Sequence, residues 1–390
     1  MRVVIYLGGF MYNSANEFSY AIGESMMKNG IDVKYVDLLS ENRGELLNNA
    51  FSEKVDFVLS FNGIGCDIKI GHESLYNELN IPFVYYLLDH PSHHKGRLMV
   101  PINKKIIICL DNSHADYVEM HPEITGITTF IPTAARYEGS NYLNTEKKYD
   151  IVFTGYLKTQ EELDKLFPQS MIDVKKYLDN LVLHKRDIYI DQDVINMVKS
   201  IPDLNYVYET TYFDMDSLIN QCDFYVRGVK RNFVIEELLK RGLTIDFYGA
   251  ISNSHEFLNY PNLHNNGMVD YKDLDNVYAE AKIALNIMPN FPEGGHDRLF
   301  MSMVHGAIPL TDCNVYLEQK IPQGLIYFNY PHVEETILEI NKVINDDDYR
   351  KTLQVANYNE VIENHTWINR LSELLYVYKE SVAYWKDMEK

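Results

Sequence analysis

Two stretches of the sequence decide the fold: Gly294-Gly295-His296-Asp297-Arg298, and Gly306–Asp312 with the sequence GAIPLTD. They predict a glycine loop, an apolar helix and a buried strand that ends in a carboxylate. Glycines let backbone N–H groups approach a ligand closely, and the helix presents its positive N-terminal end to the same place. His296 and Arg298 add donors suited to phosphate oxygens. We therefore expect an anion site here, although an ordinary loop followed by a surface arginine has the same pattern.

The length, charge and cysteine content narrow the class of protein. A chain of 390 residues suits two domains. The net charge of −20 at pH 7 argues against nucleic acid or an anionic lipid surface as a partner. The four cysteines lack any metal-binding or CxxC spacing, which fits a reducing cytoplasm. No apolar run approaches the roughly 20 residues that span a bilayer, so we expect a cytoplasmic protein without an integral membrane segment.

The first 135 residues alternate apolar runs with helical stretches. Near-continuous apolar runs, typical of strands buried on both faces of a parallel sheet, occur at residues 3–7, 31–36, 55–61, 83–88 and 106–110. In such sheets ligands bind beyond the carboxyl ends of the strands. The loop that begins with Asp89 and His90, after the fourth of these strands, is therefore a candidate site.

The second part of the chain repeats the pattern after a break. Residues 138–148 are polar and irregular, and we interpret them as a linker between two domains. Residues 160–240 lack β-rich runs except near Cys222–Val226, which predicts a helical insertion. The chain ends in a helix with Thr366 as its N-cap and an apolar stripe at helical spacing. Strands of a second sheet are predicted at residues 149–154, 243–248, 282–288, 307–311 and 325–328.

Six segments of this second part resemble, in order and spacing, the CgeB-like glycosyltransferases of bacterial cell-surface, flagellar and spore glycosylation. The six segments are Tyr149–Gly155, Leu243–Gly249, Gly267–Tyr271, Ala281–Pro289, Gly294–Asp312 and His365–Trp367. The resemblance implies the GT-B architecture, an α/β fold of two Rossmann-like domains facing across a cleft. It implies an acceptor domain over residues 1–137 and a donor domain over 149–375. The end of the last helix, 376–390, is expected to pack back on the first domain.

The resemblance also implies an enzyme that needs no separate cofactor. No DxD-like pair or cluster of metal ligands lies near the glycine loop, so we expect the enzyme to be metal-independent. It would move a sugar from a UDP- or GDP-linked donor to a protein, glycan or lipid-linked acceptor. Without a metal, basic side chains, backbone N–H groups and a helix N-terminus must meet the negative charge of the leaving diphosphate. Arg298 is the expected side chain, with a structural ion pair to Asp297 or Asp312 as the alternative. The other residues expected to bind the donor are Gly155, Tyr248, Gly249, Gly267, Val269, Asn286, Pro289, Gly294, Gly295, His296 and Asp312.

His90 and Asp89 are the candidates for the base that takes the proton of an acceptor hydroxyl, and a structural role for either stays open. One position departs from the family pattern, because Met301 stands where many relatives carry a glutamate that binds the ribose of the donor. Two alternatives therefore stay open beside the transferase. One is a nucleotide-sugar epimerase of GT-B shape. The other is a non-catalytic nucleotide-sugar-binding or assembly protein, which Met301 favours. No metal site is expected near His90, because no ordered set of carboxylates accompanies it.

Overall fold

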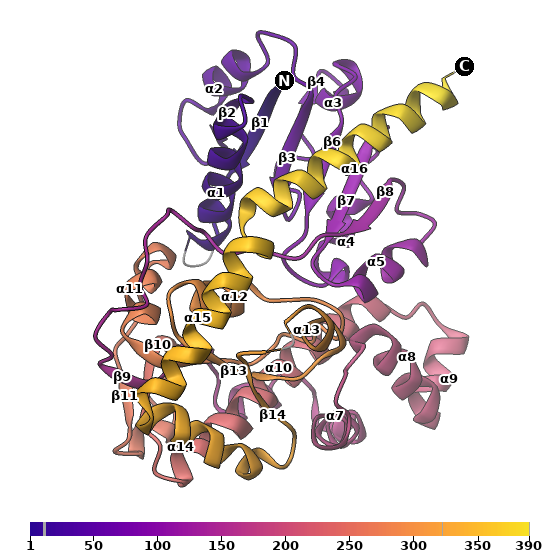
Figure 1. Ribbon diagram of the computed structural model, residues 1–390. Coiled ribbons are helices and arrows are strands. Elements are labelled where there is room, and N and C mark those ends of the chain that lie inside the picture. The colour runs from indigo at the N-terminus through magenta and orange to yellow at the C-terminus, as the bar shows by residue number, and fades with distance from the viewer. Residues whose placement is uncertain (11–12, 322, 390) are drawn as a thin grey trace. The chain divides into compact units, whose positions relative to one another are not determined.

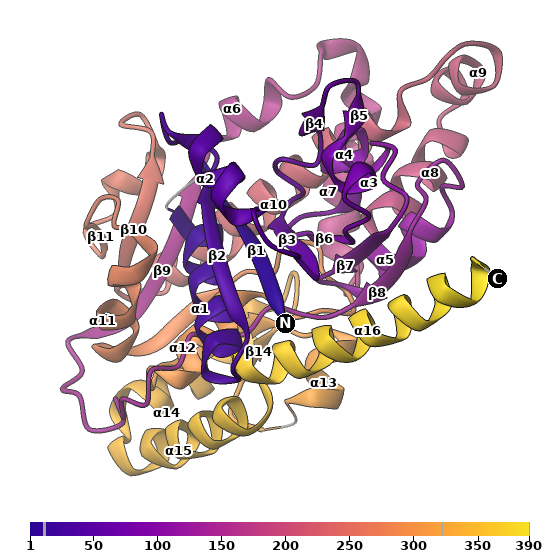
Figure 2. The ribbon, with the colours of Figure 1, turned by 90° about the horizontal axis from the view of Figure 1, so that it is seen from above.

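The computed structural model describes residues 1–10, 13–321 and 323–389, which form two α/β units (Figures 1 and 2). The first unit comprises Met1–Tyr137, Asp270–Lys272 and Asn364–Lys390, so it draws on both ends of the chain. The second unit comprises Glu138–Val269 and Asp273–Glu363. Residue 390, the last of the predicted C-terminal helix, lies outside the described residues.

The first unit is built on a parallel sheet of six strands in the order β2-β1-β3-β6-β7-β8. Its central strands are buried because their side chains are apolar on both faces, and helices cover those faces. The strands are β1 (Arg2–Leu7), β2 (Asp32–Asp37), β3 (Phe57–Phe61), β6 (Phe83–Tyr86), β7 (Lys105–Cys109) and β8 (Ile127–Phe130), with a separate hairpin of β4 (Lys69–Ile70) and β5 (Glu73–Ser74). The helices are α1 (Ser14–Lys28), α2 (Arg43–Ala50), α3 (Leu75–Glu78), α4 (Lys95–Leu98), α5 (Asn112–Glu119), α16 (Trp367–Met388) and the short η2 (Pro91–His94).

The last helix, α16, packs on the first sheet (yellow in Figures 1 and 2). It begins after Thr366, whose backbone N–H donates to the Asn369 side chain at 2.9 Å. Near its middle, the Tyr378 hydroxyl donates to the backbone oxygen of Asp56 at 3.1 Å. At its start, the ring of Trp367 lies 5.5 to 6.0 Å from three aromatic rings of α1, β3 and β6, those of Phe18, Phe61 and Tyr86. Large aromatic contacts of this kind fix the helix to the sheet.

The second unit is built on another parallel sheet of six strands, in the order β11-β10-β9-β12-β13-β14. Apolar side chains of β9, β10, β12 and β13 form its core with those of α10 and α14. The strands are β9 (Tyr149–Leu157), β10 (Ile245–Ile251), β11 (Leu263–Asn265), β12 (Ala281–Asn286), β13 (Ile308–Asp312) and β14 (Ile326–Phe328). The helices outside the insertion are α11 (Leu274–Ala279), α12 (Asp297–Val304), α13 (Val315–Lys320), α14 (Ile337–Asn345) and α15 (Asp347–Asn364).

The segment predicted as a helical insertion, residues 160–240, contains five α-helices. They are α6 (Gln160–Asp164), α7 (Ile172–His184), α8 (Ile190–Ser200), α9 (Pro202–Thr210) and α10 (Met215–Lys240). The β-rich run at Cys222–Val226 does not form a strand, because it lies inside α10. A short apolar run has the same pattern in a buried helix as in a buried strand. Here the run continues into a helix of 26 residues that packs against β9.

Candidate functional site

The carboxyl ends of β9 and β10 meet at a pair of glycines. Gly155 and Gly249 are aligned in the register of the two strands. A Cβ atom on Gly249 would lie 1.7 Å from the backbone oxygen of Gly155, so no side chain fits there. A Cβ atom on Gly155 would lie 4.0 Å from Nη2 of Arg298. The two glycines therefore leave bare backbone beside the Arg298 guanidinium.

Helix α12 begins directly after the glycine loop, with His296 as its N-cap. Nδ1 of His296 accepts a hydrogen bond from the backbone N–H of Arg298 at 3.2 Å. Burial lowers the pKa of His296, and the adjacent Asp297 opposes this shift. The lowered pKa favours the neutral imidazole, which keeps the lone pair that the cap requires. His296 thus orders the first turn of α12, whose N-terminal end carries a partial positive charge.

The glycine loop itself is held by side chains of the following helices. The Asn314 side chain donates to the backbone oxygen of Gly294 at 2.9 Å and to that of Phe291 at 2.6 Å. A Cβ atom on Gly295 would lie 2.6 Å from the ring of Phe300. The loop therefore passes so close to α12 that a glycine is needed at this position.

The Arg298 side chain, on the first turn of α12, has no ionic partner among the described residues. Its guanidinium carbon lies 5.8 Å from the centre of the Phe153 ring. Its Nη1 atom is buried without a hydrogen bond, and the guanidinium makes no ion pair with any residue that the structure describes. The alternative of a structural pair with Asp297 or Asp312 is therefore absent from the structure. A buried cation without a counter-charge is costly, which points to an anionic ligand.

A second arginine, Arg231 on α10, also makes no ion pair with a described residue. Its side chain is only 5% exposed, and its guanidinium carbon lies 4.1 Å from the centre of the Tyr156 ring. Nη1 donates to the backbone oxygen of Tyr156 at 3.4 Å, and the buried Nε has no partner among the described residues. Burial lowers the pKa of Arg231, and the positive charges of Arg298 and Arg227 act in the same direction. The two unpaired guanidinium groups are thus within electrostatic reach of each other.

Two further cations on the same helix are paired. Arg227 is bound by Asp223, with Nε–Oδ1 and Nη2–Oδ2 distances of 3.0 and 2.8 Å. Lys230 Nζ lies 3.5 Å from Oδ2 of Asp312. Burial raises the pKa of Asp312, and Lys230 opposes that shift. Oδ1 of Asp312 accepts from the backbone N–H of Met288 at 2.7 Å, so this predicted donor-binding carboxylate fixes Lys230 and the end of β12.

The α10 cations were not among the predicted site residues, because residues 160–240 were predicted only as a helical insertion. Asp223, Arg227 and Arg231 are spaced four residues apart, which places them on one face of α10, and Lys230 lies beside them. All four are buried, although most charged side chains in a helix face solvent. Charged residues recurring every four positions in a largely apolar helix were the signal available in the sequence.

The other predicted donor residues lie along the second sheet. Asn286, at the end of β12, is fully buried, and its Nδ2 donates to Thr311 Oγ1 at 3.1 Å, while Oδ1 has no partner among the described residues. Pro289 is buried in the segment that follows. Three more predicted residues are partly exposed: Tyr248 lies within β10, and Gly267 and Val269 follow β11.

Met301 lies on α12, three residues after Arg298, and is only 1% exposed. Its side chain is apolar and packed in the unit, so it offers no carboxylate to a ribose. The site therefore has no acceptor for ribose hydroxyls at this position.

His90 and Asp89 belong to the first unit, unlike all other predicted site residues. His90 is 2% exposed, its Nδ1 lies 2.7 Å from Ser92 Oγ, and its ring packs against those of His114 and Tyr117. It is also the N-cap of η2, so Asp89 does not cap that segment. Asp89 is more exposed, with its Oδ2 3.7 Å from Nε2 of the neighbouring His94. The role of either residue as a base stays a prediction.

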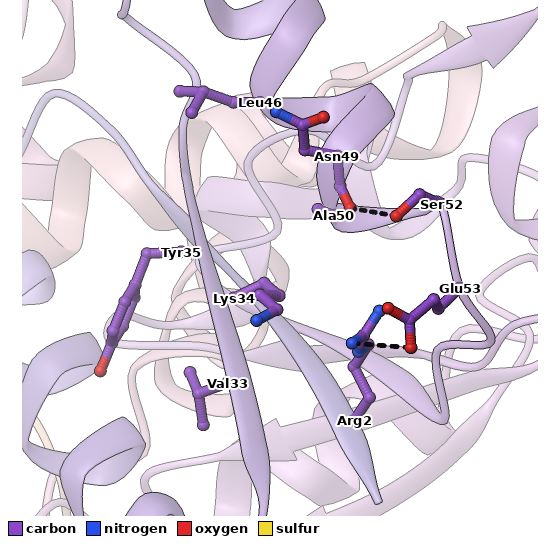
Figure 3. A pocket seen from close by; sticks show the side chains of 9 residues that line it. All are labelled: Arg2, Val33, Lys34, Tyr35, Leu46, Asn49, Ala50, Ser52 and Glu53. Atoms are coloured by element: carbon purple, nitrogen blue, oxygen red, sulfur yellow. Dashed lines mark hydrogen bonds and ion pairs between the residues drawn. The ribbon is translucent and has the colours of Figure 1, made fainter.

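The first unit also contains a hollow of about 420 Å³ between β1, β2 and α2 (Figure 3). Arg2 lies on one side of it and pairs with Glu53, with an Nη2–Oε2 distance of 2.9 Å. Arg2 is the first residue of β1, so the hollow is close to the amino end of that strand. Ligands of parallel sheets bind at the opposite, carboxyl edge, and we assign this hollow no role.

Residues 1–10, 13–321 and 323–389 contain no group of three or more histidine, cysteine, aspartate or glutamate residues arranged to hold a metal ion. Within the same ranges, every helix is too short or too polar to cross a bilayer.

Part of the second half of the chain is similar to a known protein family. Residues 230–376 match the family model described as glycosyl transferase-like. This range contains Arg231, the glycine loop and Arg298. No curated protein sequence matches the chain. The CgeB-like subfamily stays a prediction.

Several solved structures are similar over almost the whole chain. Beta-glucosyltransferase of T4 phage, in complex with UDP-glucose, is 12% identical with a TM-score of 0.55, covering 98% of this chain and 99% of its own. An alpha-glucosyltransferase in complex with UDP-glucose and DNA is 12% identical with a TM-score of 0.54, covering 97% and 99%. Sucrose-phosphate synthase from Thermosynechococcus elongatus is 12% identical with a TM-score of 0.50, covering 98% and 99%. The predicted fold class is thus confirmed: the chain has the α/β fold of the GT-B glycosyltransferases.

Proposed function

We propose that this protein is a metal-independent glycosyltransferase that takes a sugar from a nucleoside diphosphate sugar. The observation that carries the proposal is a pair of guanidinium groups that make no ion pair with a described residue: that of the buried Arg231, and that of the partly buried Arg298, whose Nη1 atom is buried. They flank Gly155, a bare backbone position at the carboxyl edge of a parallel sheet. Ligands of open α/β sheets bind at that edge, and guanidinium groups suit phosphate oxygens.

The charges of the site support a diphosphate as the ligand. Four cations belong to it, and two of them are neutralised by carboxylates in the Arg227–Asp223 and Lys230–Asp312 pairs. Two positive charges are left, which match the two negative charges of a diphosphate that joins a nucleoside to a sugar. When the sugar leaves as an oxocarbenium-like species, negative charge grows on the departing diphosphate. Arg231, Arg298 and the N-terminal end of α12 would stabilise that charge without a metal ion.

We assign the remaining predicted residues to the donor in the same way. Gly294, Gly295 and His296 would bring backbone and side-chain donors to the phosphates, and Asn286 and Pro289 would line the entry to the glycine loop. The base of the nucleotide, uracil or guanine, would lie near Tyr248, Gly249, Gly267 and Val269. The acceptor would be a protein, a glycan or a lipid-linked saccharide in the cytoplasm. DNA, present in several of the similar structures, suits a chain of net charge −20 poorly.

Incubation of the protein with UDP- and GDP-sugars is expected to release the nucleoside diphosphate and the free sugar, because water takes the place of the acceptor. The rate is expected to be similar before and after treatment with a chelator. The reason is that arginine side chains supply the positive charge that a metal would supply elsewhere. Release of nucleotide, measured by chromatography, tests the transfer. Loss of activity on chelation, with recovery on adding manganese or magnesium, contradicts metal independence. A sugar that stays nucleotide-linked but changes configuration indicates an epimerase, and binding without turnover indicates the non-catalytic alternative.

His90→Ala is expected to lower kcat by about 10²- to 10⁴-fold if His90 is the general base, with little change in donor affinity. Ser92→Ala is the matched control, because it removes only the hydroxyl 2.7 Å from Nδ1 of His90. It should have a smaller effect on kcat. Steady-state kinetics on folded variants, checked by thermal melting, make the comparison. Full turnover by His90→Ala would leave His90 a structural role and make Asp89 the next candidate.

A further inference from the structure

Asp223 is a buried carboxylate that joins two separate elements of the second unit. It lies on α10 and is 1% exposed. Its Oδ1 accepts hydrogen bonds from Nε of Arg227 at 3.0 Å and from Nδ2 of Asn290 at 2.8 Å. Its Oδ2 accepts from Nη2 of Arg227 at 2.8 Å. A carboxylate with several donors at such distances is rigidly held.

Asn290 is the other end of this connection. It lies between β12 and the glycine loop, directly after Pro289, and is 3% exposed. Its φ angle is +24°, a conformation that residues other than glycine rarely adopt. Such a backbone persists only where surrounding contacts enforce it. Two contacts hold Asn290 here: its side chain donates to Asp223, and its backbone N–H donates to the backbone oxygen of Met288 at 3.1 Å. The bond to Asp223 therefore helps to set the path by which the chain enters the glycine loop.

The two elements joined by Asp223 are those that carry the unpaired arginines. On α10, Arg231 lies two turns after Asp223 on the same face. On the other side, the segment from Asn290 leads through the glycine loop to Arg298 at the start of α12. We infer that Asp223 is a positioning residue that fixes the separation of Arg231 and Arg298, an inference that rests on the proposed donor site.

Asp223 also sets the charge of the site. It neutralises Arg227, whose positive charge otherwise acts on Arg231. Without the negative charge of the carboxylate, the positive charge of Arg227 would act more strongly on a diphosphate. A variant that loses only the negative charge of Asp223 therefore separates the two effects. The arginines are positioned less well for the reaction, but the positive charge that attracts the diphosphate is not reduced.

Asp223→Asn, which keeps the shape of the side chain, is the deciding variant. We expect kcat for a nucleotide sugar to fall at least tenfold, because misplaced donors stabilise the leaving group poorly. We expect the Kd of the nucleoside diphosphate alone, measured by calorimetry, to be unchanged or lower. A residue needed only for folding would reduce affinity, turnover and melting temperature together, and that outcome overturns the inference. Unchanged kcat in the folded variant overturns it as well.

Asp193→Asn is the matched control. Asp193 is another buried aspartate of this unit, and both its oxygens bind Lys185 Nζ, at 2.6 and 2.7 Å, but it lies on α8. It should leave kcat unchanged. Asn290→Ala keeps the Asp223–Arg227 pair and loses only the hydrogen bond between residue 290 and Asp223. It should therefore lower kcat without altering the charge of the site. If Asp223→Asn does not fold, Asn290→Ala is the variant that tests the inference. If the wild-type protein binds no nucleoside diphosphate, the proposed function itself fails. If it binds and turns over but Asn290→Ala is fully active, only the inference on Asp223 fails.

Discussion

Arg231→Met is expected to weaken the binding of UDP or GDP by about 10- to 150-fold, because a hydrogen bond to a charged group contributes about 1.5–3 kcal/mol. Arg298→Met should have a similar effect. In the absence of nucleotide, we expect Arg231→Met to melt at the same temperature as the wild type or higher, because the variant no longer buries a guanidinium that has no counter-charge. Calorimetry with nucleotide and thermal melting without it measure the two effects.

Arg241→Met is the control for this experiment. Arg241 follows the last residue of the same helix, α10, but it is paired with Glu237 and partly exposed. It should bind nucleotide like the wild type. If Arg231→Met and Arg298→Met both bind as tightly as the wild type while remaining folded, the two guanidinium groups are not a phosphate site. The proposed function then loses the observation that carries it.

Gly249→Ala is expected to destabilise the second unit by about 3 kcal/mol or more, the upper range for an overpacked core. The added methyl group would lie 1.7 Å from the backbone oxygen of Gly155, so β9 and β10 must separate at their ends. Differential scanning calorimetry and hydrogen exchange in β9 and β10 are the measurements. Fluorescence is a poor probe, since both tryptophans, Trp367 and Trp385, belong to the first unit.

Gly242→Ala separates steric clash from backbone strain. Gly242 has a φ angle of +77°, but a Cβ atom there would have no neighbour within 4 Å. The variant should therefore show only the cost of a left-handed conformation, about 1–2 kcal/mol. Equal losses for the two variants would mean that the Gly155–Gly249 contact relaxes easily. A much larger loss for Gly249→Ala would support the close approach of the two strands as the reason for glycine at this edge.

The predictable parts of the fold were those with long apolar runs. Phe57–Phe61 and Ile308–Asp312 are buried along their whole length, and burial on both faces produces the continuous pattern from which they were predicted. The edge strands β8 and β11 were missed. Ile127–Phe130 is only half-buried and contains two threonines, and Leu263–Asn265 has three residues, two of them exposed. Short polar strands at an edge are ordered by their neighbour, not by a pattern of their own.

The site was partly predictable for a related reason. Arg298 was found because a glycine loop and a helix start adjoin it in the sequence. Arg231 comes close to Arg298 only through the fold, because the two arginines are 67 positions apart in the sequence. Asp223 and Asn290 are separated by the same interval. Contacts between segments so far apart depend on the tertiary packing of α10, and no local pattern reports them.

The division of the chain between the two units has a consequence for the order of folding during synthesis. The second unit is nearly one continuous stretch, from Glu138 to Glu363, and can fold as soon as that stretch has left the ribosome. The first unit needs Asn364–Lys390 as well. Until these last residues emerge, the aromatic surface that later receives Trp367 is open to water or to chaperones. The first unit therefore combines residues that are made before the second unit with residues that are made after it, and it cannot be completed until the second unit has been synthesised.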